Sequence, residues 1–173
     1  MIDSKILLAS AQTGNADSFG TLYSMYSREL YLYALKLLGN REDAEDAVQQ
    51  ASLEVYTHLK SIRKPESFKA YYFKALANAS RSMLSKKKIH IVSDDEIPEI
   101  PDGTDVQRQT EESTGIDSAL RKLSDDERQI VLLSVIGGFN SAEIAKITDF
   151  ARGTVRSKLS RALKKMKAEL EGD

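Results

Sequence analysis

The sequence predicts an all-α protein with two small helical domains joined by a flexible acidic linker. Apolar residues recur at the three- and four-residue steps of a helix face in both halves of the chain, and no segment resembles a pair of strands. Between the halves, residues 89–115 lack this periodicity, hold two of the three prolines and contain the densest acidic run. We therefore expect a first domain at 1–88, a linker at 89–115 and a second domain at 116–173.

The first domain is expected to be a bundle of three long helices and one weaker helix. Apolar faces with helical spacing place the weaker helix at 3–12 and the long helices at 17–38, 41–60 and 67–87. Gly39 ends the first long helix, and the acidic residues that follow Asn40 suit the positive end of the next one. Short joins between amphipathic helices predict a compact bundle.

The second domain is expected to begin with a helix near Ile116. A further helix is expected from Ser124, because Ser124 and Glu127 have the spacing of a capping box. The residues of this helix that we expect to face the core are Ile130, Val131, Val135 and Ile136. Gly137 and Gly138 end the helix.

The segment 140–161 predicts two short helices joined by a tight turn. Asn140 and Glu143 repeat the capping-box spacing, and Asp149 in the corner tolerates left-handed turn geometry. The outer face of the second helix carries cations and hydroxyls, namely Arg152, Thr154, Arg156, Ser157, Lys158, Ser160 and Arg161. Such side chains suit the major groove of DNA, which predicts a helix-turn-helix with the second helix as reader. The alternative is an ordinary solvated basic face, because helix pairs of this kind also occur in plain bundles.

Residues 137–167 resemble region 4 of bacterial RNA polymerase sigma factors of the extracytoplasmic-function (ECF) type. The positions that match the family pattern are Gly138, Glu143, Ile144, Ala145, Gly153, Thr154, Val155, Ser157, Leu159, Arg161 and Ala162. Asp149 and Ala151 stand where the family usually has Gly and Ser, so the reading helix lacks its usual hydroxyl cap, at a cost of up to about 1 kcal/mol. The resemblance implies that the reading helix binds the −35 element of a promoter.

Residues 40–59 resemble region 2 of the same family. The matching positions are Asp43, Ala44, Glu45, Asp46, Val48, Gln49, Leu53 and Val55. In the family this helix docks on a coiled coil of the RNA polymerase clamp. The resemblance therefore implies that Asp46 and Gln49 bind polymerase. Gln50 and Ser52, which depart from the pattern, are further candidates. Without the resemblance, a solvated acidic helix face is the better explanation of these residues.

Residues 66–84 resemble the part of region 2 that captures the melted strand of the −10 element. Ser67, Phe68, Ala70 and Asn78 match the family pattern. Flipped bases need aromatic surfaces and polar edges, and the displaced backbone needs cations. The candidate residues for this task are Arg63, Lys64, Lys69, Tyr71, Lys74, Asn78 and Arg81. We expect their neighbours Phe68, Tyr72 and Phe73 to lie in the core of the bundle instead.

Composition excludes several other classes of protein. The chain has a net charge of −1, but both predicted domains carry net positive charge and flank a strongly acidic strip, a distribution that fits a polyanion partner. There is no cysteine, the two histidines lie far apart, and no phosphate-binding or nucleophile motif is present. We therefore expect no enzymatic activity, no metal and no cofactor. Without a long apolar run or a signal-peptide pattern, we expect a cytoplasmic protein that does not insert into membranes.

The hypothesis that joins these patterns is an ECF sigma factor. The resemblance implies three partners: the clamp coiled coil of core RNA polymerase, promoter DNA and an inhibitory anti-sigma protein. We expect weak binding to DNA by the chain alone, because neither domain is strongly basic. One alternative is a stand-alone helix-turn-helix regulator that acts without polymerase. Another is an interaction module whose basic helix binds an acidic protein.

Overall fold

The computed structural model describes residues 3–93 and 114–172, and within them the chain forms helices and no strand, as predicted. The helices are α1 (Ser4–Gln12), α2 (Ala16–Leu38), α3 (Arg41–Thr57), α4 (Phe68–Ser93), α5 (Thr114–Arg121), α6 (Asp125–Val135), α7 (Ser141–Thr148) and α8 (Arg152–Glu171). Two single 3₁₀ turns, η1 (Leu59–Ser61) and η2 (Pro65–Ser67), lie between α3 and α4. Helix α4 extends five residues into the predicted linker, and residues 94–113 lie outside the described ones. The proposed domain boundaries stay predictions.

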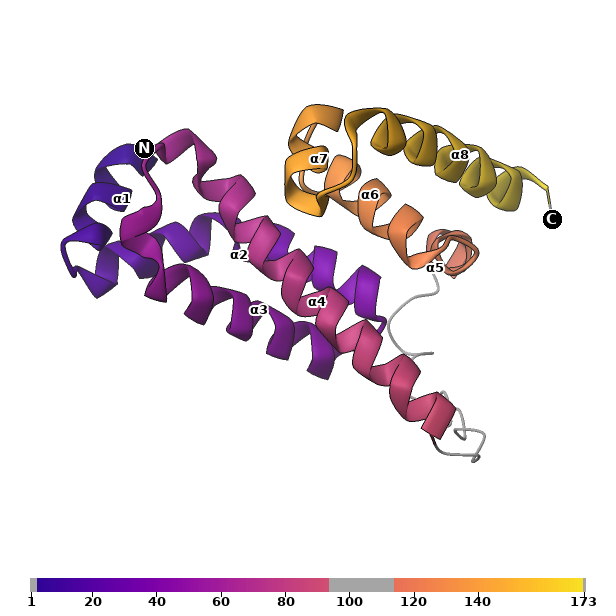
Figure 1. The fold of residues 1–173 in the computed structure, drawn as a ribbon, viewed down its shortest axis with the longest axis horizontal. Coiled ribbons are helices and arrows are strands. Elements are labelled where there is room, and N and C mark those ends of the chain that lie inside the picture. The colour runs from indigo at the N-terminus through magenta and orange to yellow at the C-terminus, as the bar shows by residue number, and fades with distance from the viewer. Residues whose placement is uncertain (1–2, 94–113, 173) are drawn as a thin grey trace.

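The N-terminal domain is a bundle of α2, α3 and α4, with α1 packed against one end (Figure 1). Asn15 and Asn40 cap α2 and α3 through their side chains, and Gly39 ends α2 with a left-handed φ of 84°. The aromatic residues that the sequence places in the core are there: Phe68, Tyr72 and Phe73 are almost fully buried. Burial raises the pKa of Tyr72 to about 12, although a hydrogen bond with Ser52 opposes the shift.

The C-terminal domain packs α5, α6 and α7 against the long helix α8. Both predicted capping boxes form. The side chains of Ser124 and Asn140 accept hydrogen bonds from the backbone N–H groups of Glu127 and Glu143, and the backbone N–H groups of Ser124 and Asn140 donate to the carboxylates of Glu127 and Glu143 in return. One predicted core residue is wrong: Val135 is 70% exposed.

The reason is that α6 is buried on two sides, against α8 and against α2 of the other domain. Its buried residues are therefore nearly consecutive, from Glu127 to Leu133. Val135 lies at the last position of the helix, beyond that stretch.

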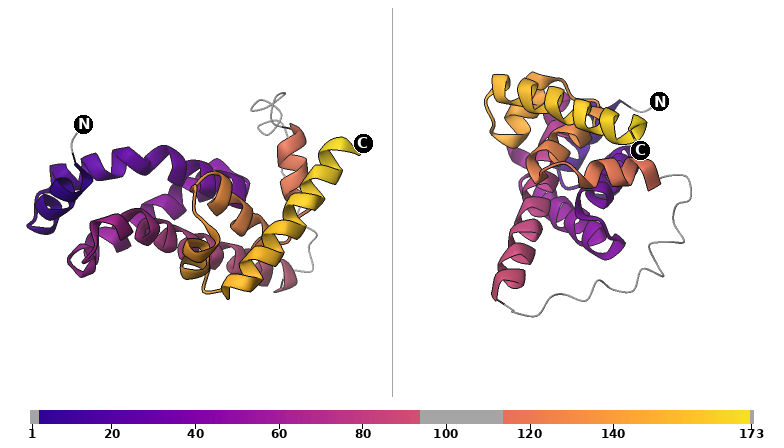
Figure 2. Two further views of the ribbon diagram at one scale, coloured as in Figure 1. Left: turned by 90° about the horizontal axis from the view of Figure 1, so that it is seen from above. Right: turned by 90° about the vertical axis from the view of Figure 1, so that its right-hand side faces the viewer.

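The two domains pack against each other along α2 and α4 (Figure 2). The rings of Phe73 on α4 and Phe139 beyond α6 meet edge to face, with centroids 5.2 Å apart. At the other end of the contact, Lys36 of α2 forms an ion pair with Asp117 of α5 at 2.8 Å. A buried aromatic pair with a polar rim makes this a packed interface between the domains.

Candidate nucleic-acid and polymerase interfaces

Helices α7 and α8 form the predicted helix-turn-helix. Asp149 has a left-handed φ of 63°, the one positive φ among the described non-glycine residues, and it turns the chain between the two helices. Ile144 and Ile147 of α7 and Val155 of α8 are buried together in the domain core. This packing fixes the direction of α8, so the opposite side of the helix faces away from the domain core.

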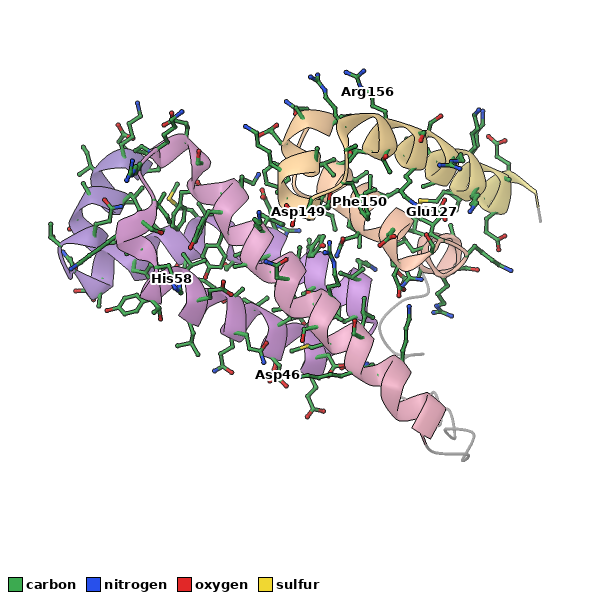
Figure 3. The ribbon with its side chains drawn as sticks, viewed as in Figure 1. Asp46, His58, Glu127, Asp149, Phe150 and Arg156 are labelled. Atoms are coloured by element: carbon green, nitrogen blue, oxygen red, sulfur yellow. The ribbon has the colours of Figure 1, made fainter. Side chains whose placement is uncertain are left out.

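The outer face of α8 is accessible to solvent in the described chain. The exposed members of the predicted set are Arg152, Arg156, Ser157, Ser160 and Arg161, while Thr154 and Lys158 are half-buried. The Arg161 guanidinium donates to the Ser157 carbonyl at 3.3 Å, and the Lys158 ammonium lies 5.8 Å from the centre of the Phe150 ring. Arg156 extends from the outer edge of the domain, away from the N-terminal domain (Figure 3).

The first turn of α8 has no side-chain cap. Ala151 occupies the N-cap position in extended conformation and makes no capping hydrogen bond, as the missing hydroxyl predicts. By contrast, α6 and α7 both begin with complete capping boxes. Helix α8 is therefore the least well capped of these three helices.

The seven residues predicted for the −10 element fall into two groups. Four of them lie away from the second domain's contacts: Arg63 and Lys64 are exposed between η1 and η2, Asn78 is exposed on α4, and Tyr71 is half-buried. They combine cations, an amide and an aromatic ring along the loop and α4. This combination is suited to unpaired bases.

The other three are engaged by the C-terminal domain. The Lys69 ammonium donates to the Gly137 carbonyl at 2.8 Å and lies 5.4 Å from the centre of the Phe139 ring, and it also pairs with Glu29. The Arg81 guanidinium donates to the Gln129 amide oxygen at 3.0 Å. The Lys74 ammonium lies 3.5 Å from a carboxylate oxygen of Asp149 in the helix-turn-helix corner. In this arrangement these three cations face protein.

The residues predicted for polymerase binding lie along α3. Asp46, Gln49 and Gln50 are exposed, and Asp46 lies on the side of the molecule opposite Arg156 (Figure 3). Ser52 is different: its hydroxyl donates to the Val48 carbonyl at 2.7 Å and forms a hydrogen bond with the Tyr72 hydroxyl. Its polar group is thus used inside the bundle.

A groove of about 580 Å³ runs beside these residues between α2 and α3. Asp46, Gln49 and Ser52 line one wall of it. The opposite wall is aromatic and consists of Phe19, Tyr23 and Tyr31 of α2. We did not select these rings from the sequence as binding residues. The sequence signal that could have identified them is the number of aromatic residues in α2, which is larger than the buried face of one helix needs.

The acidic start of α3 has a structural role. Asn40 and Lys87 lower the pKa of Asp43 by hydrogen bonding to its carboxylate.

Across residues 3–93 and 114–172, no group of three His or carboxylate side chains is arranged to hold a metal ion. Within the same segments, no helix combines the length and apolar character that crossing a membrane requires.

Comparison with known families and curated proteins gives consistent matches. Residues 22–89 match the family described as Sigma-70 region 2, and residues 114–166 match Sigma-70, region 4. The RNA polymerase sigma factor SigV of Bacillus subtilis is 28% identical over 87% of this chain and 89% of its own length. The ECF RNA polymerase sigma factor SigW of the same organism is 24% identical, with 94% of each chain covered. The ECF sigma factor SigM of Mycobacterium tuberculosis is 27% identical over 90% of this chain and 79% of its own.

Solved structures share the fold. CnrH, solved in complex with the cytosolic domain of CnrY, superposes with a TM-score of 0.74 at 23% identity and covers 99% of both chains. The sigma factor RpoE of Bartonella quintana, solved with the anti-sigma factor NepR, gives a TM-score of 0.71 at 23% identity, over 90% of this chain and 98% of that one. Regions 2 and 4 follow one another here in the order the sequence predicted, and the chain belongs to the ECF family of RNA polymerase sigma factors.

Proposed function

We propose that this protein binds core RNA polymerase and directs it to promoters by recognising −10 and −35 elements. The observation that carries the proposal is the presence, in one chain, of both sigma regions with their polar faces placed apart: Asp46 on α3 and Arg156 on α8. A stand-alone regulator would need the helix-turn-helix but would leave the exposed polar face of α3 without a task.

The polymerase contact would be made by α3. Asp46, Gln49 and Gln50 offer exposed polar groups, and the neighbouring groove offers the aromatic rings of Tyr23 and Tyr31. A helix of the clamp coiled coil could bury apolar side chains in that groove while the rim makes hydrogen bonds. Ser52 contributes less, because its hydroxyl already has partners.

The two promoter elements would be read by different chemistry. On α8, the exposed side chains of Arg152, Arg156 and Arg161 would bind guanine edges or phosphates in the −35 major groove, together with the hydroxyls of Ser157 and Ser160. On the N-terminal domain, Tyr71 would stack on an unpaired base of the −10 element while Arg63 and Lys64 hold its backbone.

Use of the whole −10 surface requires the two domains to separate. Lys69 and Arg81 cannot reach DNA while they contact Gly137 and Gln129, whereas Lys74 is held only by an exposed pair with Asp149. Polymerase would supply the energy for this separation by binding the open form more tightly. The free chain should therefore bind promoter DNA weakly.

We also propose an anti-sigma protein as a partner. CnrH and RpoE, which share this fold, were both solved with such an inhibitor or with a partner's cytosolic domain. An inhibitor that holds the domains in the packed arrangement would keep Lys69 and Arg81 away from DNA.

The test is run-off transcription with purified core polymerase on a promoter library, together with a pull-down of core enzyme. We expect this chain to bind core and to direct initiation from a defined pair of elements. If core enzyme does not bind the chain, the proposal is wrong. If the free chain binds one operator at nanomolar concentration, the stand-alone regulator is the better description.

A further inference from the structure

We propose that Gln12, the last residue of α1, is a positioning residue that fixes the loop between α3 and α4 in the shape needed to capture the melted −10 strand. The inference rests on the proposed function, because the loop matters only if Arg63 and Lys64 contact DNA. It assigns a role to α1, which lies before the segment that matches region 2.

The contact is a double hydrogen bond to the loop backbone. The Gln12 side-chain amide nitrogen donates to the Leu59 carbonyl at 3.0 Å and to the Ile62 carbonyl at 2.8 Å. Both partners are carbonyl oxygens, which only accept hydrogen bonds. The amide nitrogen of Gln12, and not its oxygen, must therefore face them. One side chain thereby spans the two ends of η1, across 47 and 50 residues of sequence.

The loop is also restrained by local hydrogen bonds, from the Ser61 backbone to the His58 carbonyl at 3.0 Å and from the Ile62 backbone to the Leu59 carbonyl at 3.3 Å. Leu59 and Ile62 anchor it in the core, with exposed fractions of 4% and 7%. Arg63 and Lys64 follow directly and are exposed. A shift of the Ile62 backbone would therefore move both cations, because no secondary structure separates them from it.

Helix α1 is itself held firmly enough to act as a support. Leu7, Leu8 and Ala11 bury its inner face against the bundle, and Asp3 caps its first turn. At its other end, the Ser18 hydroxyl of α2 donates to the Ser10 hydroxyl at 2.9 Å. Gln12 thus connects a packed helix to the loop.

The shape of the loop and the stability of the domain therefore depend on different contacts. The apolar anchors remain when the Gln12 hydrogen bonds are lost, so the bundle should persist while the loop gains freedom. Capture of an unpaired strand depends on groups held in place before the strand arrives. Loss of Gln12 should therefore slow promoter opening more than it weakens polymerase binding.

The experiment compares holoenzymes that contain the wild-type chain, Gln12→Leu or Gln12→Asn. Leucine has a similar size but no donor, and asparagine keeps the amide on a side chain too short to span both carbonyls. Thr13→Ala is the matched control, because the Thr13 hydroxyl bonds only to Ser10 within its own helix end. Opening is followed by permanganate reactivity of unpaired thymines, on a fully paired promoter and on one with a preformed −10 bubble.

We expect both Gln12 variants to open the paired promoter about tenfold more slowly, since two hydrogen bonds are lost. The preformed bubble should restore most of the rate, and core affinity and Tm should match those of Thr13→Ala. Amide hydrogen exchange at Ser61–Lys64 should be faster in the free variants.

Two results would overturn the inference. One is an unchanged opening rate for both variants while Arg63→Ala with Lys64→Ala is defective. The other is a loss of activity that follows a lower Tm in both variants, which would make Gln12 a structural residue. If the wild-type chain itself does not direct transcription, the proposed function fails, and this result is distinct from either of the two.

Discussion

The two surfaces proposed to bind DNA differ in what covers them. On α8 the arginines of the outer face are exposed, whereas on α4 Lys69, Lys74 and Arg81 are bonded to the C-terminal domain. The same packing thus leaves one proposed DNA-binding face open and covers part of the other. Separation of the domains would therefore expose more of the proposed −10 surface than of the proposed −35 surface.

The largest effect is expected from Phe139→Ala. The Phe139 ring packs on Phe73 and beneath the Lys69 ammonium, so its removal should cost about 3 kcal/mol of packing, mostly between the domains. We expect the radius of gyration from small-angle X-ray scattering to rise, and the free chain to bind single-stranded −10 DNA more tightly. Val135→Ala, at an exposed apolar position nearby, is the control. An unchanged radius would show that the interface does not depend on this ring.

Arg156→Ala tests the open surface. Loss of a base-reading arginine should cost about 1–3 kcal/mol and relax selectivity at one position of the −35 element. Transcription from promoters with single substitutions measures both effects. Lys167→Ala, an exposed cation farther along α8, should leave the selectivity unchanged. Equal losses for the two variants would mean that α8 contributes only general positive charge.

Substitution of Glu127 tests how strongly α6 is held to α8 within the C-terminal domain. Burial raises the pKa of Glu127, but hydrogen bonds from Lys165 and Ser124 outweigh it, so the pKa falls below the ordinary value of 4.5. A lowered pKa contributes stability above the unfolded value, and this stability is lost as the pH falls through the folded value.

We therefore expect Glu127→Gln to lower the free energy of unfolding by about 1–2 kcal/mol at pH 7. The difference from the wild-type chain should shrink below about pH 4.5. Urea unfolding at pH 7 and pH 4 measures it. A difference that is the same at both pH values would mean that the charge of Glu127 is unimportant.

The smallest effect is expected from Lys74→Ala. The Lys74–Asp149 pair joins the domains, but its side chains are 43% and 72% exposed and its atoms are 3.5 Å apart. Exposed pairs of this kind contribute no more than about 1 kcal/mol, so domain packing should be unchanged in scattering measurements. Any effect of this variant should appear on −10 DNA within holoenzyme, where the lysine is free to bind. Domain separation in the free variant would contradict this ranking.

Local sequence signals predicted local structure well. The capping boxes at Ser124 and Asn140 and the left-handed turn at Asp149 depend on residues within a few positions of each other, and all three form. The helix-turn-helix followed from the same signals. The buried aromatic face of α4 followed from helical period alone.

Contacts between distant helices could not be predicted in this way. The periodicity of α4 shows Lys69 and Arg81 as polar residues but contains no information about Gly137 or Gln129. Val135 was misplaced for the related reason that α6 is buried from two directions, which one apolar stripe cannot describe. Ser52 was predicted as a polymerase contact from the family resemblance alone, and the sequence did not indicate that its hydroxyl bonds to Tyr72 on another helix.

The double burial of α6 has a practical consequence for dissecting the protein. A fragment that begins at Thr114 would keep the contact of α6 with α8 but would expose to water the side that carries Gln129 and faces α2. Such a fragment should self-associate more readily than the intact polypeptide. Biophysical work on the helix-turn-helix is therefore better done with a mutated 173-residue chain than with an excised piece.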